Sequence, residues 1–150
     1  VRALTDLSLT FLSSLIRHRG GLLNVASTAA FVPGPRMAVY YATKAYVLSF
    51  SEALHRELAP SGVRVTALCP GPVPTEFQER AGMRREGLIR LLSLSPSRVA
   101  RIGYRDFMRG KRVAIAGIRN RVAILSTRFA PRSLILAVTD QSMQASRLDA

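Results

Sequence analysis

Apolar residues recur at helical spacing near the start of the chain and form short runs further on. Between residues 4 and 16 they lie three or four positions apart, which predicts a helix that ends before the Gly20-Gly21 pair. The mainly apolar run Leu22–Ala26 follows a glycine turn, which predicts a buried strand. Residues 27–36 are rich in small residues and proline and predict a loop.

The same alternation continues to the end of the chain. Ser95 followed by Pro96 is typical of a helix start, with a capping hydroxyl and then proline at the first helical position. Pro131 interrupts the helical patches of the C-terminal part. The pattern predicts helices over 37–58, over 75–94 with a break near Gly82, and over 96–108, and strands over 63–68 and 112–116.

Helices that alternate with strands are typical of an open parallel α/β sheet. Three strands make a thin sheet, because parallel strands need covered faces and neighbours on both edges. The apolar strand at Leu22–Ala26 has the composition of a strand inside a sheet. We therefore expect further strands before Val1, and a chain that is one part of a single domain.

The net charge of +13 is concentrated in one region. Residues 80–132 contain fourteen basic and two acidic side chains, whereas residues 1–79 contain seven and five. A solvated basic face is favoured, and contact with an anionic partner or membrane surface is the second interpretation. Nucleic acid is not favoured, because the region has neither interleaved aromatic residues nor a known binding motif. No apolar run is long enough to predict a membrane-spanning helix.

Cysteine and histidine add little chemistry to this picture. Cys69 has no partner for an internal disulfide, which fits a reducing compartment, and its place at a strand end favours a small buried residue over a reactive thiol. His18 and His55 lie in no metal-ligand spacing, so we expect no metal site.

The candidate chemistry lies on the predicted helix 37–58 and on the loop before it. Tyr40 and Lys44 are four residues apart and therefore share one helix face. A nearby ammonium lowers the pKa of a tyrosine, which then exchanges a proton near neutral pH, as carbonyl reduction or alcohol oxidation requires. Ser27 ends a strand on the side where open α/β sheets bind ligands. A Tyr and Lys pair alone is weak evidence, since many amphipathic helices carry one.

The residues around the pair strengthen this interpretation. The strings Asn24-Val25-Ala26-Ser27, Tyr40-Tyr41-Ala42-Thr43-Lys44 and Cys69-Pro70-Gly71-Pro72-Val73-Pro74-Thr75 occur in that order. Together they resemble the short-chain dehydrogenase/reductase family over nearly the whole chain. The resemblance implies an NAD(P)-dependent oxidoreductase that interconverts an alcohol and a carbonyl by hydride transfer. It implies the fold class as well: α/β, a partial Rossmann-type doubly wound parallel sheet with only the C-terminal strands and helices.

The resemblance also assigns roles to individual residues. Tyr40 would be the general acid/base, Lys44 would lower its pKa and bind the nicotinamide ribose, and Ser27 would position the substrate oxygen. The remaining cofactor-binding residues would line the nicotinamide end, and Val73 and Thr75 would meet the carboxamide. They are Pro70, Gly71, Val73 and Thr75. Tyr41 points about 100° away from Tyr40 on an ideal helix, so we expect it to serve packing.

The family's glycine-rich phosphate loop does not occur in residues 1–150. A further family asparagine, twenty-seven positions before the serine, would fall one residue before Val1. We therefore expect these residues to be the C-terminal catalytic and substrate part of the domain, without the N-terminal dinucleotide-binding half, and inactive alone. NAD and NADP are not distinguishable, because the residues that select between them would lie in that half.

Substrate and partners are less closely determined. Residues 76–94 are apolar with interspersed arginines, which is compatible with a lipophilic or acyl-chain carbonyl substrate. Amphipathic helices that simply pack on the core give the same pattern. Helices 1–17 and 37–58 resemble those through which family members pair, so we expect a homo-oligomer, in the cytoplasm. Residues 112–130 mix Arg with large apolar residues and suit a peripheral membrane contact. The alternatives are a non-catalytic, truncated α/β scaffold and a basic module that binds membranes or anions.

Overall fold

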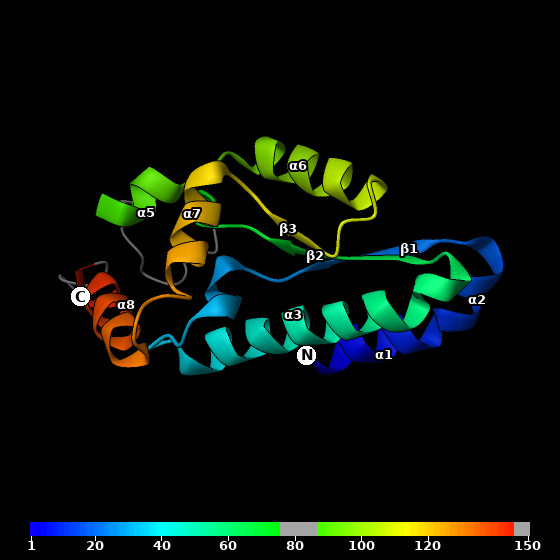
Figure 1. The fold of residues 1–150 in the computed structure, drawn as a ribbon, viewed down its shortest axis with the longest axis horizontal. Helices are drawn as coiled ribbons and strands as arrows, with labels where there is room; N and C mark the ends of the chain where they lie inside the picture. The colour runs from blue at the N-terminus through cyan, green and yellow to red at the C-terminus, as the bar shows by residue number, and fades with distance from the viewer. Residues whose placement is uncertain (76–86, 146–150) are drawn as a thin grey trace.

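The computed structural model describes residues 1–75 and 87–145 as a three-stranded sheet between helical layers (Figure 1). Ser95 caps its helix as predicted, because its hydroxyl accepts from the amide of Arg98. The elements are α1 (Arg2–Thr10), α2 (Leu12–His18), β1 (Gly21–Val25), the 3₁₀ turn η1 (Thr28–Phe31), α3 (Ala38–Leu58), the 3₁₀ turn η2 (Ala59–Ser61), β2 (Arg64–Cys69), α5 (Gly87–Leu92), α6 (Pro96–Met108), β3 (Val113–Ile115), α7 (Ile118–Ser126) and α8 (Arg132–Ala145).

The three predicted strands form one parallel sheet in the order β1-β2-β3. Leu22 pairs with Val65, and Ala67 pairs with Val113. The central strand β2 is buried along five of its six residues. Helices α1, α2 and α3 cover one face of the sheet, and α6 covers the other (Figure 1). The predicted α/β class and the parallel arrangement are therefore confirmed.

Of three sequence predictions, one needs correction, one is not tested and one lies outside the described residues. The helix expected over 4–16 is divided at Phe11, where the backbone turns to φ −86° and ψ −1° and one helix ends as the next begins. Within the described sheet β1 is an edge strand, and Val25 is 53% exposed, so the expectation of a further strand beside Leu22–Ala26 stays a prediction. The predicted break near Gly82 lies outside the described residues.

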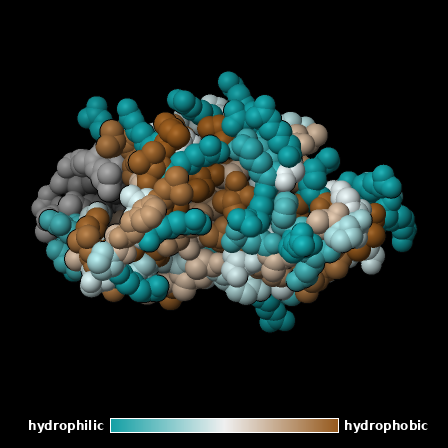
Figure 2. All heavy atoms as spheres, viewed as in Figure 1, coloured by the Kyte–Doolittle hydropathy of each residue, from teal (hydrophilic) through white to brown (hydrophobic). Residues whose placement is uncertain are grey.

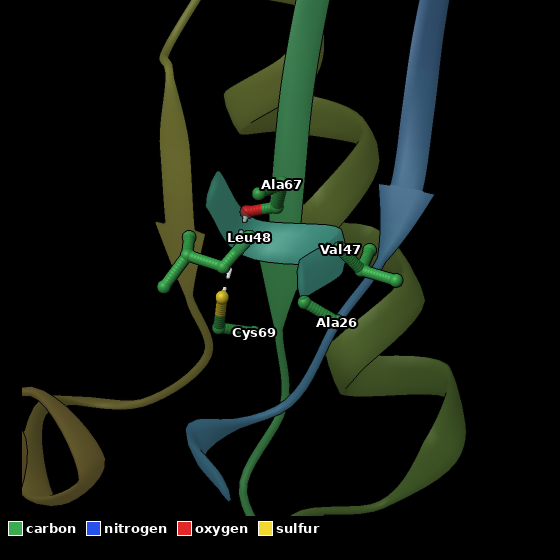
Figure 3. Packing of buried hydrophobic residues seen from close by; sticks show 5 residues of the cluster. All are labelled: Ala26, Val47, Leu48, Ala67 and Cys69. Atoms are coloured by element: carbon green, nitrogen blue, oxygen red, sulfur yellow. Dashed lines mark hydrogen bonds between the residues drawn. The ribbon is translucent and has the colours of Figure 1, made fainter. Parts of the chain in front are cut away.

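The core beneath the carboxyl end of the sheet joins β1, β2 and α3. Ala26, Val47, Leu48, Ala67 and Cys69 pack together there (Figure 3). Burial raises the pKa of the Cys69 thiol to about 12. A thiol that holds its proton so firmly is a poor nucleophile, which confirms the interpretation of Cys69 as a small packing residue.

A buried carboxylate ties the other side of the sheet together. Asp106 of α6 is fully buried, and its Oδ1 lies 3.1 Å from Nζ of Lys111 and 3.0 Å from Nη2 of Arg105. Its Oδ2 lies 3.6 Å from Nη2 of Arg121 on α7. Lys111 also accepts a hydrogen bond through its carbonyl from Thr66 on β2. Asp106 therefore links α6, the turn before β3, and α7.

Helices make up most of the chain, and the longest described helix is α3 with 21 residues. Within residues 1–75 and 87–145, no helix combines the length and apolar character needed to cross a membrane.

Candidate functional site

The site lies at the carboxyl ends of β1 and β2, which meet at one edge of the parallel sheet. Chain segments 27–31 and 70–75 leave the sheet there side by side. The amide of Ala26 donates to the carbonyl of Leu68, and the amide of Thr28 donates to the carbonyl of Pro70 at 2.8 Å. Ladder bonding thus continues past the strands and holds the segment of Ser27 against the Pro-Gly loop.

Helix α3 brings the predicted tyrosine and lysine to this edge. Nζ of Lys44 donates to the carbonyl oxygen of Val25 at 3.0 Å, so the last residue of β1 anchors the ammonium. The same Nζ lies 5.8 Å from the centroid of the Tyr40 ring. Burial lowers the pKa of the Lys44 ammonium, and the neighbouring Cys69 opposes this shift. An ammonium has three donors, so two remain for other acceptors.

Ser27 is held in a defined orientation. Its hydroxyl oxygen accepts a hydrogen bond from the amide of Ala29 at 3.1 Å and so caps the turn η1. Because the oxygen accepts from the backbone, the hydroxyl proton is left to donate elsewhere. The predicted loop 27–36 therefore begins with an ordered turn that fixes a potential donor.

A cavity of about 320 Å³ opens between these elements. Every residue predicted to act in catalysis or cofactor binding lines it, although the predicted roles themselves stay predictions. These residues are Ser27, Tyr40, Lys44, Pro70, Gly71, Val73 and Thr75. We call this cavity the site pocket. Its volume falls within the usual range for small-molecule sites, about 300 to 1,000 Å³.

Tyr41 lines the site pocket as well, which the sequence analysis did not expect. Its ring packs edge-on to that of Tyr40, with 5.9 Å between the centroids, and lies against Gly34. Burial raises the pKa of the Tyr41 phenol, and the charge of Tyr40 adds to the effect. Tyr41 therefore stays neutral and is a wall of the pocket. An ideal-helix angle could not show this, because the wall is completed by Gly34 from the preceding loop.

Asn120 is a further residue of this region, and its role was not predicted from the sequence. A Cβ atom on Gly71 would collide with the Asn120 side chain, so only glycine fits at that position. The Asn120 side chain is 2% exposed and donates to the carbonyls of Leu92 and Ala116 at 3.1 and 2.7 Å. It thereby holds the Pro-Gly loop, α5 and the end of β3 together. The only sequence feature that could have pointed to Asn120 was its position shortly after the predicted strand 112–116.

Helix α8 closes one side of the site pocket. Met143 lines the cavity and is buried. Nε of Arg36, in the loop before α3, lies 2.9 Å from Oδ1 of Asp140. This ion pair fastens α8 beside the start of α3, so residues from the far end of the chain complete the site.

No metal-binding group is evident among the described residues, where no three His, Cys, Asp or Glu side chains gather closely enough to hold an ion.

Comparison with known proteins agrees with this geometry. The family model described as short chain dehydrogenase matches residues 1–86, which is more than half of the chain and includes Ser27, Tyr40 and Lys44. The chain belongs to the short-chain dehydrogenase family. Membership confirms the resemblance seen in the sequence and does not favour the alternative of a non-catalytic scaffold.

The chain is also similar to individual oxidoreductases and to solved structures. The chain is 43% identical over 70 residues to NADPH-dependent 1-acyldihydroxyacetone phosphate reductase of Schizosaccharomyces pombe, a match that covers 47% of the chain. It is 38% identical over 77 residues to serine 3-dehydrogenase of Agrobacterium fabrum, a match that covers 51% of the chain. A short-chain dehydrogenase from Sphingobium yanoikuyae, solved with NADPH, superposes with a TM-score of 0.70 at 29% identity over 86% of the chain.

The matches cover only part of each relative. The aligned segments span 24% of the Schizosaccharomyces reductase and 31% of the Agrobacterium dehydrogenase. The structural match spans 51% of the Sphingobium protein. The chain thus corresponds to about half of the related structure, and the activity of the whole protein is a matter for proposal.

Proposed function

We propose that the protein containing this chain is an NAD(P)-dependent oxidoreductase that interconverts an alcohol and a carbonyl compound. The observation that supports this most strongly is the convergence of Ser27, Tyr40 and Lys44 on one cavity, beside the loop at 70–75. Relatives in complex with NADPH, NADP and NADH support both cofactors equally.

The residues of the site pocket fit the nicotinamide end of such a cofactor. Pro70, Gly71, Val73 and Thr75 would line it, and the free donors of Lys44 would meet the ribose hydroxyls. Only glycine fits at position 71, because a Cβ atom there would collide with Asn120 behind the loop. When bound, the reduced cofactor supplies a hydride to the carbonyl carbon.

The chain's own residues supply the proton and hold the substrate. Tyr40 would give its hydroxyl proton to the carbonyl oxygen as the carbon is reduced, and would take it back in the oxidation direction. Ser27 would donate its hydroxyl proton to the same oxygen in a hydrogen bond, because its own oxygen is occupied by the amide of Ala29. Lys44, held by the carbonyl of Val25, would stabilise the phenolate through its positive charge.

The replacement Ser27→Ala tests this proposal in the full-length protein. We expect a loss of turnover of about 10²-fold, the usual cost of removing one donor to a developing oxyanion, with unchanged affinity for the reduced cofactor. Steady-state reduction of a panel of ketones and aldehydes measures turnover, and fluorescence titration measures cofactor binding. Ser97→Ala, on the exposed start of α6, is the matched control. Full activity in the Ser27 variant would remove Ser27 from this role.

The remaining expectations about location and partners are proposals too. Residence in the cytoplasm is compatible with the free, buried Cys69, since a reducing compartment keeps thiols unpaired. Contact with an anionic membrane surface is supported by exposed apolar residues beside arginines on α7 and the turn after it, above all Phe129, which is 88% exposed. Self-association is supported by exposed Leu7, Leu9 and Phe11 at the start of the chain. Membrane contact is measured by sedimentation with anionic vesicles at low salt. Self-association is measured by sedimentation equilibrium without vesicles. Failure to sediment, or a monomer throughout, would remove the respective proposal.

A further inference from the structure

Two further cavities adjoin the site pocket in a row. The first, of about 360 Å³, shares Thr28, Ala29 and Tyr41 with the site pocket, so the substrate side of the site continues into it. The second, of about 600 Å³, shares walls with the first cavity. Those shared wall residues are Ile124, Thr127, Ala130 and Ile135. We call the first the apolar pocket and the second the arginine pocket.

The apolar pocket suits an aliphatic chain. Large apolar side chains of α5, α7 and α8 line it, among them Leu92, Ile124 and Val138, and no charged side chain of the described residues does. Three of its five hydroxyl groups are already used, because Ser126, Thr127 and Thr139 each donate to a backbone carbonyl three or four residues earlier. The Asn120 amide likewise donates to two carbonyls. Few polar hydrogens therefore remain for a polar ligand.

The arginine pocket carries an excess of positive charge. Arg112 and Arg121 line it and have partners, since Arg112 lies 2.9 Å from Oε1 of Glu52 and Arg121 reaches Asp106. Arg128 and Arg132 line it too, and neither forms an ion pair with any residue in the described ranges 1–75 and 87–145. Two guanidinium groups without an ion-pair partner in the described ranges leave a site suited to an anion. Guanidinium groups bind carboxylate and phosphate with paired hydrogen bonds.

Both features lie around the same helices. Figure 2 shows hydrophobic side chains gathered on the visible face around α7, with hydrophilic side chains between them. α7 contributes Ile124 and α8 contributes Ile135 to both pockets. A ligand that reached from one pocket to the other would therefore present an apolar segment to one end and an anionic group to the other.

We propose that the substrate is an anionic amphiphile: a carbonyl or alcohol compound whose aliphatic segment lies in the apolar pocket and whose terminal carboxylate or phosphate binds Arg128 and Arg132. The placement of the reacting carbon rests on the proposed function, since it is set by Tyr40 and Ser27. The binding of the ligand's aliphatic segment and of its anionic group rests on the two pockets alone.

Calorimetric titration of the full-length protein tests this with three probes. Dodecanoate, used below its micelle concentration, has both an aliphatic chain and a negative charge. Dodecanol has only the aliphatic chain, and inorganic phosphate has only the negative charge. We expect dodecanoate to bind at least about tenfold more tightly than dodecanol, because charge-assisted hydrogen bonds to arginine are lost in the alcohol. We expect no measurable binding of phosphate. Equal affinity for dodecanoate and dodecanol, or phosphate binding as tight as that of dodecanoate, would overturn the proposal.

Two sets of variants locate the ends of the ligand. Arg128→Gln with Arg132→Gln should weaken dodecanoate binding at least about tenfold and leave dodecanol unchanged. Arg98→Gln with Arg101→Gln makes the same charge change on α6, which contributes no residue to the arginine pocket, and should change neither. Equal losses in both pairs would mean a general charge effect and would contradict the assigned site.

Filling the apolar pocket gives an independent measurement. Ala123→Trp should weaken the binding of both dodecanoate and dodecanol, because the added ring takes the space of the chain, whereas Ala100→Trp on the exposed side of α6 should not. Unfolding curves show whether each variant remains folded. Unchanged binding in a folded Ala123 variant would contradict the proposal.

Binding and turnover separate this inference from the proposed function. Tyr40→Phe should bind dodecanoate like the unaltered protein. Selective binding of dodecanoate without reduction of any carbonyl compound would count against the proposed function only. Reduction of small neutral ketones with no preference for chain or charge would count against the anionic amphiphile only.

Discussion

Replacing Tyr40 with phenylalanine in the full-length protein should lower turnover by about 10²- to 10⁴-fold, the usual contribution of a general acid/base. The ring stays in place, and so does the hydrogen bond from Lys44 to Val25, so the affinity for reduced cofactor should change little. Only the hydroxyl that would carry the proton is removed. Steady-state reduction of the best carbonyl substrate and fluorescence titration of the cofactor measure the two effects.

The neighbouring tyrosine provides a matched control for this experiment. Tyr41→Phe removes the same atom from a ring that lines the same pocket and packs edge-on to Tyr40. Its phenol has a raised pKa because it is buried, so it is poorly suited to exchange a proton near neutral pH. Turnover should therefore stay within a few-fold. Similar losses in both variants would show that the hydroxyl of Tyr40 has no special part in the reaction.

Replacing Asp106 with alanine should lower the free energy of unfolding more than any other substitution proposed for this protein. The carboxylate is fully buried and balances Arg105, Lys111 and Arg121, whose side chains are each partly exposed. Removing one member of a buried charge network typically costs about 3 to 5 kcal/mol in the free energy of unfolding. We expect a value of about 3 kcal/mol, because the three cations can still reach water. Urea unfolding followed by circular dichroism measures the loss.

The pH dependence of this loss follows from the pKa of Asp106. Burial by itself would raise the pKa of this carboxyl, but the hydrogen bonds and charges of Lys111 and Arg105 outweigh it and hold the pKa below its ordinary value. A group whose pKa is lower in the folded state stabilises the protein fully above its unfolded-state pKa. That contribution is lost as the pH falls through the folded-state pKa. The difference in the free energy of unfolding between the unaltered protein and the Asp106 variant should therefore be largest at neutral pH and should decrease in acid.

Asp140 provides the control for the stability measurement. It is the acidic partner of the exposed ion pair with Arg36, and exposed pairs contribute about 0 to 1 kcal/mol. Asp140→Ala should therefore change the free energy of unfolding much less than Asp106→Ala. Equal effects would show that burial does not set the importance of Asp106.

Several features of the site were predictable because they depend on near neighbours in the chain. Tyr40 and Lys44 share a helix face whatever the surroundings, since four residues make about one turn. Ser27 and Pro70 each follow an apolar strand, and parallel strands bring their carboxyl ends to one edge. These local rules, together with the resemblance, predicted seven residues for the site, and all seven line the site pocket.

Other features were not predictable, because they depend on backbone breaks and on contacts between elements that apolar spacing does not encode. The helix expected over 4–16 reads as continuous in its apolar spacing, yet its backbone turns at Phe11. Asn120 matters only through its contact with Gly71 and its hydrogen bond to the carbonyl of Leu92. Tyr41 is a pocket wall only because Gly34 leaves room for its ring. Periodicity within one element contains no information on such partners.

The sequence by itself determined the order of helices and strands, the family, and the serine, tyrosine and lysine of the candidate site, because repeating apolar spacing and short motifs encode these locally. Only the tertiary structure decided that α8 closes the site, since the pair of Arg36 and Asp140 joins residues 104 positions apart. It also decided which arginines of the basic region have an acidic partner: Arg121 pairs with the buried Asp106, whereas Arg128 and Arg132, which line the same cavity, form no ion pair within the described ranges. Net charge counts both groups alike, and only their surroundings separate a structural ion pair from a candidate anion site.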